Sequence, residues 1–431
     1  MPIIERLTAA EILDSRGRPT VEATCTLAGG AYASASVPSG ASTGAAEAIE
    51  LRDRDPQRYG GYGCRKAVAS VKGEIHGALA GRSFADQEEL DRALIALDGT
   101  PNKSRLGANA VLAVSVAFAR ASAQEQGVPL YRYCAAMLGQ SPDTLPRLTI
   151  NLFSGGRHAG RQVAIQDVLM IPARPSTVDQ SLAMAYDVYQ AAAALVLKRY
   201  SMRLLTADEG GLAPPCDSAE ELIETAVVAI KTAGYKPGID VMLGLDVAAS
   251  HFYDHRQYHL DGAILDSAGM IARVVRWVER YPIVSVEDGL AEEDWEWWPT
   301  LRQALEKRAL VVGDDLLCTN PERIRRAIEA RACNTLLLKP NQIGTLTEAA
   351  EAWRLAKDAG WKVTISVRSG ETEDNWAADL AVGWRADQFK AGSITQSDRL
   401  AKYNRLLAIE ADTGWPVVAW PKAIAGATLL P

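Results

Sequence analysis

The sequence has few cysteines and no spacing that would gather them around one zinc ion. Its six cysteines are scattered along 431 residues without a CxxC pair, which argues against a zinc site. The amino terminus, MPIIERLTAAEI, lacks the apolar core of a signal peptide. We therefore expect a reduced, cytoplasmic protein.

Long apolar runs and an excess of positive charge are also missing. No apolar stretch approaches the roughly 20 residues that cross a bilayer. The net charge of −7 offers no long-range attraction for nucleic acid or anionic lipid, so we expect neither nucleic acid nor a membrane as a partner. Any anion that the protein binds must be held by local cations or by a metal.

What the chain does have is the composition of an ordinary globular protein, with 48% hydrophobic and 23% charged residues. Residues 3–36 alternate as antiparallel strands do, with Gly29-Gly30 as a turn. Residues 66–138 have a helical pattern. We expect a small α+β domain over residues 1–130 and a second domain over residues 140–431.

The segment VPSGASTGAAEAIELRD, residues 37–53, is predicted to be a Gly/Ser/Thr loop that runs into a helix. One interpretation is a flexible connector with a Ser or Thr helix cap. The other is a mobile lid whose hydroxyl groups reach a metal or a phosphate. The residues alone leave both interpretations open.

The second domain begins with two strand patterns, in LTINLFSGGRHAG (148–160) and VAIQDVLMIPA (163–173), followed by two helical stretches. Six further apolar runs alternate with helical stretches, and each run stops at a charged residue. These residues are Asp246, Glu287, Asp314, Lys339, Arg368 and Lys390. The pattern predicts an α/β fold, a (β/α) barrel with its catalytic groups at the carboxyl ends of the strands. The terminal stretch, residues 414–426, is expected to be a packed terminal segment.

The acids and lysines at these strand ends suggest a metal site with a base. Asp246, Glu287 and Asp314 come from successive strands, so they can converge on one hard cation such as Mg²⁺. Each acid alone could instead cap the helix that follows its strand. Burial of Lys339 and Lys390 would lower their pKa toward the range of a general base. The alternative is exposed lysines that merely neutralise the acids.

Four further segments carry weaker signals. Arg368-Ser369 offers a guanidinium fork and a hydroxyl that suit a phosphate, with a surface salt bridge to Glu371 or Glu373 as the alternative. His158 lies in a glycine-framed loop, GGRHAG. Glu209 lies in the motif DEGG. Acids before paired glycines are common in plain turns, so this motif is a weak signal in isolation. The histidines of HFYDHRQYH, residues 251–259, favour an exposed hairpin over a metal site.

At this point the chain resembles the enolase family. The matching motifs, in order, are DSRGRPTVE (14–22), SGASTG (39–44), NKSRLGANAVLAVS (102–115), DEGG (208–211), SVEDGL (285–290), GDDL (313–316), KPNQIGTLTE (339–348), RSGETED (368–374) and SDRLAKYN (397–404). The resemblance implies a ββαα(βα)₆ barrel with a smaller amino-terminal α+β domain. It also implies two Mg²⁺ ions per site, for which Mn²⁺ can substitute, and a homodimer or higher homo-oligomer.

The resemblance also assigns roles by position. Asp246, Glu287 and Asp314 would hold the first Mg²⁺, and Ser42 would help to bind the second. Lys339 would remove the C2 proton of the substrate.

The remaining implied roles concern the leaving hydroxyl and the anionic groups of the substrate. Glu209 would be the acid that assists loss of the C3 hydroxyl, and Lys390 would pair with the substrate carboxylate. Arg368 and Ser369 would hold the phosphate. His158, together with Asp167, is expected among the catalytic groups.

Three departures from the enolase pattern fall around the substrate. Val367 stands where enolases have His. Asp167, after Gln166, stands where enolases have Glu. Arg157 occupies the middle of the GG-x-HA loop, where enolases usually have Glu or Ser. We therefore expect Arg157, Gln166 and Val367 to contact a modified substrate. The pattern suggests the carboxyphosphonoenolpyruvate synthases of phosphonate antibiotic pathways, whose substrate carries an extra carboxylate on phosphorus.

The expected activity is thus a Mg²⁺-dependent dehydration of a small phosphorylated or phosphonylated hydroxy acid. The main alternative is ordinary glycolytic dehydration of 2-phosphoglycerate. A non-catalytic binding protein is disfavoured, because Lys339, Glu209 and the three acids are all present.

Overall fold

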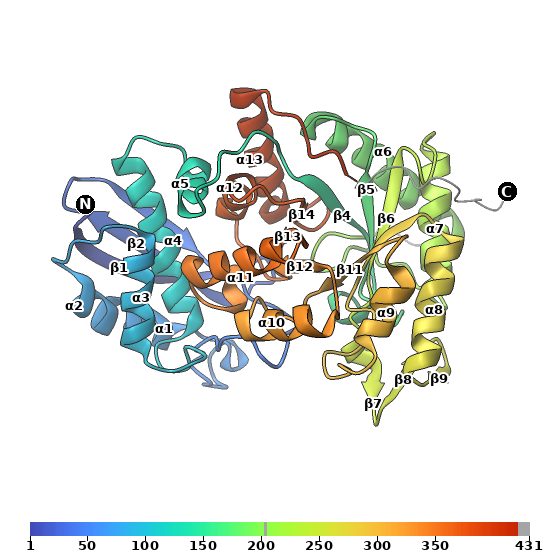
Figure 1. Cartoon of the computed structure of the whole chain (residues 1–431), viewed down its shortest axis with the longest axis horizontal. Coiled ribbons are helices and arrows are strands. Elements are labelled where there is room, and N and C mark those ends of the chain that lie inside the picture. The colour runs from blue at the N-terminus through green and yellow to red at the C-terminus, as the bar shows by residue number, and fades with distance from the viewer. Residues whose placement is uncertain (202–204, 421–431) are drawn as a thin grey trace.

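The computed structural model describes residues 1–201 and 205–420. Figure 1 shows a small amino-terminal part, coloured blue to cyan, beside a larger barrel whose helices surround its strands. In the described part of the chain, no helix has the length and apolar character needed to cross a bilayer.

The amino-terminal part is built on an antiparallel sheet in the order β1, β2, β3. The strands are β1 (Ile4–Leu13), β2 (Pro19–Leu27) and β3 (Tyr32–Ser36). Gly30 has a φ of +91° in the turn between β2 and β3, which glycine adopts without steric cost. The strands and the turn predicted for residues 3–36 are therefore confirmed.

Helices then cover this sheet and connect it to the barrel. They are α1 (Arg65–Ser70), α2 (His76–Leu79), α3 (Gln87–Asp98), α4 (Ala108–Glu125) and α5 (Leu130–Met137). The Ala-rich α4 packs on β2, β3 and α5 and is buried on nearly all sides. Small side chains permit this close approach on every face.

The helix predicted within residues 37–53 is wrong, since this segment is irregular. Its main chain bonds to distant parts of the molecule instead of to itself. The N–H of Ala48 donates to the carbonyl of Gln342 (2.7 Å), and the N–H of Ile49 donates to the carbonyl of Asn102 (2.8 Å). These tertiary hydrogen bonds satisfy the backbone without a helix, which outweighs the local helix propensity.

The barrel opens with β4 (Arg147–Ser154), β5 (Asp167–Pro172), α6 (Val178–Tyr200) and α7 (Ala219–Thr232). Six strand and helix pairs follow. They are β6 (Val241–Asp246) with α8 (Ser267–Arg280), β10 (Ile283–Glu287) with α9 (Trp298–Leu305), β11 (Leu310–Gly313) with α10 (Pro321–Ala330), β12 (Thr335–Leu338) with α11 (Leu346–Asp358), β13 (Lys362–Ser366) with α12 (Trp376–Gly383), and β14 (Gln388–Lys390) with α13 (Ser397–Thr413).

Strand pairing confirms the predicted ββαα(βα)₆ barrel. The closed order is β10-β11-β12-β13-β14-β4-β5-β6. Only β5, among the barrel strands described, runs antiparallel to both neighbours. All the other pairs are parallel, so their carboxyl ends meet at one rim.

Two shorter predictions concern the histidine-rich segment and the tail. A small sheet of β7 (Tyr253–Asp254), β8 (Gln257–Leu260) and β9 (Ala263–Leu265) contains the expected hairpin, with His255 exposed at its turn. In the tail, Trp415 packs edge-on against Tyr131. Residues 421–426 of the predicted terminal segment lie outside the described residues.

Candidate active site

Charged residues gather at the carboxyl rim of the barrel, as the strand-end pattern predicts. Asp246 ends β6, Glu287 ends β10, and the two are register partners. Lys390 ends β14, while Asp314 and Lys339 come directly after β11 and β12. All five are buried or nearly so, which is where electrostatic interactions are strongest.

Lys390 joins two of the acids. Its Nζ lies 2.8 Å from Oδ2 of Asp246 and 2.8 Å from Oε2 of Glu287. Burial opposes charge on Lys390, but the two carboxylates outweigh it and hold its pKa well above the usual range. Burial and the neighbouring Asp246 raise the pKa of Glu287 despite Lys390. One ammonium thus does not fully compensate the two carboxylates.

Lys339 pairs with the third acid. Its Nζ lies 2.6 Å from Oδ2 of Asp314, and the side-chain amide of Gln342 donates to the other oxygen at 2.9 Å. Burial alone lowers the pKa of Lys339, yet attraction by Asp314 outweighs it and raises the pKa. The lowered pKa expected for both lysines is therefore wrong for this arrangement, because each lysine lies against a carboxylate.

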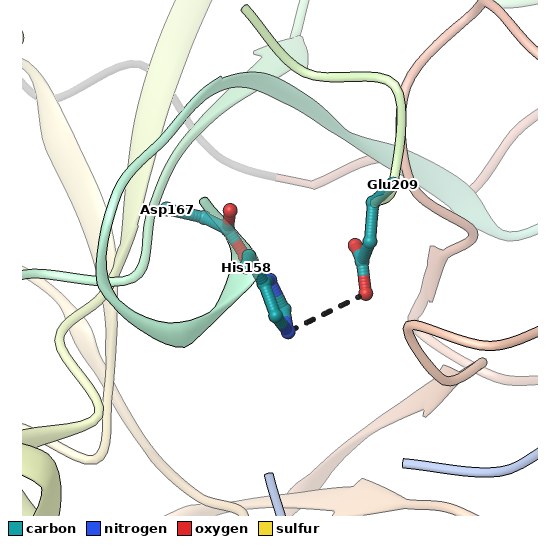
Figure 2. A group of neighbouring side chains, drawn as sticks. All are labelled: His158, Asp167 and Glu209. Carbon is teal, nitrogen blue, oxygen red and sulfur yellow. Dashed lines mark hydrogen bonds and ion pairs between the residues drawn. The ribbon is translucent and has the colours of Figure 1, made fainter. Parts of the chain in front are cut away.

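His158 lies between two further carboxylates, as Figure 2 shows. Its Nδ1 is 2.9 Å from Oδ2 of Asp167, and its Nε2 is 3.8 Å from Oε1 of Glu209. Burial lowers the pKa of His158, but Asp167 and Glu209 raise it to about 9 overall. Asp167 is further fixed by Asn151 and Ser154, which both donate to its Oδ1 at 2.7 Å. The imidazole is held charged and in one orientation.

Arg368 is a buried cation with a partner from the amino-terminal part. Its side chain is only 3% exposed, and its Nη1 lies 2.9 Å from Oε2 of Glu47. A second guanidinium nitrogen donates to the carbonyl of Ser42 at 2.7 Å. The alternative of a surface salt bridge to Glu371 or Glu373 is therefore wrong.

The loop of residues 39–47 covers this rim, held at several points. Ser39 forms a two-residue bridge with Gly370, and the N–H of Ala41 donates to Oγ of Ser369 at 2.8 Å. The hydroxyl of Ser42 lies 3.0 Å from Nε2 of His251. The remaining cavity is only about 20 Å³, roughly enough for one water. A substrate therefore requires this loop to move, which favours the lid interpretation over a passive connector.

Most of the predicted site residues line this one cavity. They are Ser42, His158, Gln166, Glu209, Asp246, Asp314, Lys339, Val367, Arg368, Ser369 and Lys390. Glu287 and Asp167 lie just behind it, in contact with Lys390 and His158 respectively. Arg157 does not line the cavity, since its side chain is exposed.

Several residues at this site are absent from the sequence-based prediction. Glu47 and Gln342 contact Arg368 and Asp314, and His251 contacts the lid. Arg16 donates to Oγ of Ser369 at 3.1 Å. Arg16, in the motif DSRGRPTVE, and Gln342, in the motif KPNQIGTLTE, had a sequence signal, because both motifs belong to the enolase pattern.

The residues present fit a hard divalent cation. Asp246, Glu287 and Asp314 offer buried carboxylate oxygens without a soft ligand, as Mg²⁺ prefers. The buried Oε1 of Gln166 has no hydrogen-bond partner in the described part of the chain, although its amide nitrogen donates to Asp246 at 3.1 Å. These three acids, with Ser42 on the lid, are the residues that would hold metal.

Comparison with protein families agrees with the fold. The family model described as "Enolase, C-terminal TIM barrel domain" matches residues 142–420. The model described as "Enolase, N-terminal domain" matches residues 4–134. The first match alone spans more than half of the chain and contains the acids and lysines at the barrel rim. The chain therefore belongs to the enolase family, and it is an enolase-superfamily enzyme, a lyase.

Proposed function

We propose that this enzyme removes water by enolase-type β-elimination, with Mg²⁺ as cofactor, from a 2-phosphoglycerate-like acid that carries a hydroxyl on C3 and a phosphoryl or phosphonyl group on the C2 oxygen. The observation that carries the proposal is one small cavity lined by Lys339, Glu209, Lys390 and Arg368. A base, an acid and two anion-binding cations around one cavity are the groups that this reaction needs.

Each side chain has a role that follows from its chemistry. Lys339 Nζ takes the C2 proton. Glu209 passes a proton to the departing C3 hydroxyl, and the charged imidazole of His158, whose Nε2 lies 3.8 Å from Glu209 Oε1, is the source of that proton. Lys390 pairs with the substrate carboxylate. When bound to Asp246, Glu287 and Asp314, Mg²⁺ would stabilise the negative charge developing on the substrate and weaken the attraction of Asp314 for Lys339.

The phosphorus end of the substrate has its own binding groups. Arg368 presents a fork that suits phosphate oxygens, and Ser369 places its hydroxyl beside it. The substrate would displace contacts that these groups make now, to Glu47 and to the N–H of Ala41. Binding at the phosphorus end is thereby linked to movement of the lid.

We further propose that the substrate is a modified 2-phosphoglycerate, such as a carboxyphosphono analogue used in phosphonate natural-product biosynthesis. Val367 lines the cavity with an isopropyl group, where the enolase pattern has an imidazole. Exposed Arg157 lies next to His158. The pKa of His251 is lowered mainly by burial and, to a smaller extent, by the charge of Arg157. The second candidate is ordinary 2-phosphoglycerate, favoured by the retained Lys339, Glu209 and acids.

The purified enzyme should be assayed with Mg²⁺ on 2-phosphoglycerate and on its carboxyphosphono analogue, by following formation of the enol product. We expect a larger kcat/KM for the analogue. A larger kcat/KM for 2-phosphoglycerate would favour ordinary glycolysis, and turnover of neither substrate would favour a binding protein. A cytoplasmic location and a homo-oligomeric state stay predictions.

A further inference from the structure

Asp288 directly follows Glu287 and is buried, with only 3% of the residue exposed. Both of its carboxylate oxygens accept backbone N–H groups. Oδ1 accepts from Asp314 at 3.0 Å, and Oδ2 accepts from Asp315 at 2.8 Å. The side chain of one strand end therefore fixes the main chain of the next strand end.

The backbone of Asp288 is held in an unusual conformation at the same point. Its φ is +43°, a left-handed conformation that is strained for a non-glycine residue. Its N–H donates to the carbonyl of Val312 at 3.0 Å, and its carbonyl accepts from Ala249 at 3.0 Å. These bonds hold the conformation that turns the carboxylate toward Asp314.

Asp288 thus connects the ends of three neighbouring strands. Glu287 ends β10, Val312 and Asp314 lie at the end of β11, and Ala249 follows the end of β6 at Asp246. Each of these strands supplies one of the three acids that would hold metal. The spacing between those acids depends on how firmly the three strand ends are joined.

A direct role of Asp288 as a ligand fits the contacts less well. Ligand atoms of Asp288, Asp314 and Asp315 all lie within 4.8 Å of one another, so they resemble a cation site. However, both oxygens of Asp288 already accept N–H bonds. Asp288 has no ion-pair partner among residues 1–201 and 205–420, so its four backbone contacts are what hold it there.

We propose that Asp288 is a positioning residue that sets the separation of Asp314 from Glu287 and Asp246, and thereby the affinity of the site for a divalent cation. The inference rests on the proposed function, because it takes these three acids as the metal ligands. It assigns to Asp288 a task distinct from binding the ion or contacting the substrate.

The test replaces Asp288 and measures metal affinity directly. In the wild type both side-chain oxygens of Asp288 accept a backbone N–H. In Asp288→Asn one of these oxygens becomes an NH₂ group, which cannot accept, so one backbone N–H loses its acceptor. Asp288→Ser keeps one acceptor oxygen. We expect Mn²⁺ affinity, measured by calorimetry on the full-length protein, to fall about 10- to 100-fold in Asp288→Asn. The number of bound ions should stay the same. Amide exchange at residues 314 and 315 should become faster.

Asp294→Asn is the matched control. Asp294 is also a buried aspartate after β10, but it accepts from the hydroxyls of Tyr258 and Ser267. This control should lower the melting temperature and leave Mn²⁺ affinity unchanged. Wild-type Mn²⁺ affinity in folded Asp288→Asn or Asp288→Ser would overturn the proposal, and so would an equal loss of affinity in the control.

The result separates this inference from the proposed function. If wild-type protein binds Mn²⁺ through these acids but turns over neither substrate, the proposed function fails and the role of Asp288 stands. If wild-type protein binds no divalent cation, the positioning role fails as well. If Asp288→Asn does not fold, the Mn²⁺ affinity of Asp288→Ser decides the question.

Discussion

Lys390 Nζ lies 2.8 Å from Asp246 and 2.8 Å from Glu287, so one ammonium group joins the ends of two adjacent barrel strands. The same carboxylates are the proposed metal ligands. A divalent cation and the Lys390 ammonium therefore compete for overlapping negative charge. Binding of the cation should release Lys390 toward the substrate carboxylate.

The first prediction is a strict metal requirement. Activity should need Mg²⁺ or Mn²⁺ and should disappear in excess EDTA, since the three acids provide hard oxygen ligands. Asp246→Asn should weaken Mn²⁺ binding, measured by calorimetry. Re-addition of Mg²⁺ after chelation is the control and should restore activity. Full turnover in excess EDTA would contradict the prediction.

The second prediction separates the base from the acid. Lys339→Ala should abolish exchange of the C2 proton with solvent, measured by NMR in deuterated water. Glu209→Gln should retain this exchange and mainly block loss of the C3 hydroxyl, because the two groups act in successive steps. Both variants should bind Mn²⁺. Normal exchange in Lys339→Ala would move the base elsewhere.

The strand-end residues were predictable because each closes a short apolar run of the kind typical of a buried strand. Parallel strands bring their carboxyl ends to one rim, so Asp246, Glu287 and Lys390 meet there without further information. The order of the barrel elements was predictable as well, since the patterns of β4 and β5 indicate two consecutive strands before two helices.

Partners that come from distant parts of the chain were not predictable. Glu47 and Arg368 lie 321 positions apart in the sequence, and nothing local marks them as a pair. For the same reason, residues 37–53 carried a helical pattern although their backbone is satisfied by Gln342 and Asn102. The raised pKa of Lys339 likewise depends on its contact with Asp314, which only the folded chain provides.

A third prediction concerns the lid. His251→Ala removes the contact with the Ser42 hydroxyl, and one hydrogen bond contributes about 0.5 to 1.5 kcal/mol. We expect KM to change by up to about tenfold and amide exchange in residues 39–47 to become faster. His255→Ala, at the exposed hairpin turn, is the control and should change neither. Unchanged exchange in His251→Ala would show that the lid is held without it.

A fourth prediction concerns pH and stability. Burial raises the pKa of Asp91 from 3.8 to about 6, despite hydrogen bonds from Ser115 and Thr347. Because the folded-state pKa is raised, the protonated form favours folding. The contribution is complete below about pH 4 and is lost as the pH rises through about 6.

The size of this effect follows from the shift, at about 1.4 kcal/mol for each pKa unit. The free energy of unfolding should lose up to about 3 kcal/mol from this group between pH 4 and pH 7. Asp91→Asn should flatten that part of the profile, measured by urea unfolding. Exposed Asp217→Asn is the control. A profile that keeps its wild-type slope in Asp91→Asn would contradict the assignment.

The last prediction is that Arg157 and Val367 direct the enzyme away from 2-phosphoglycerate. Arg157 adjoins His158, and we propose that its guanidinium pairs with the extra carboxylate of the analogue once the lid moves. Such a charge-assisted contact contributes about 1.5 to 3 kcal/mol. Val367 presents an isopropyl group at the cavity wall, where the enolase pattern has a larger imidazole.

The double change Arg157→Glu with Val367→His should therefore shift kcat/KM toward 2-phosphoglycerate and away from the carboxyphosphono analogue. Every 1.4 kcal/mol of transition-state stabilisation corresponds to about tenfold in rate, so the expected loss on the analogue is about 10- to 150-fold. Arg256→Glu makes the same charge change at the exposed hairpin turn and should leave the ratio of the two substrates unchanged. Efficient wild-type turnover of 2-phosphoglycerate that the double change does not improve would assign the enzyme to ordinary glycolysis, because neither residue would then be selecting the substrate.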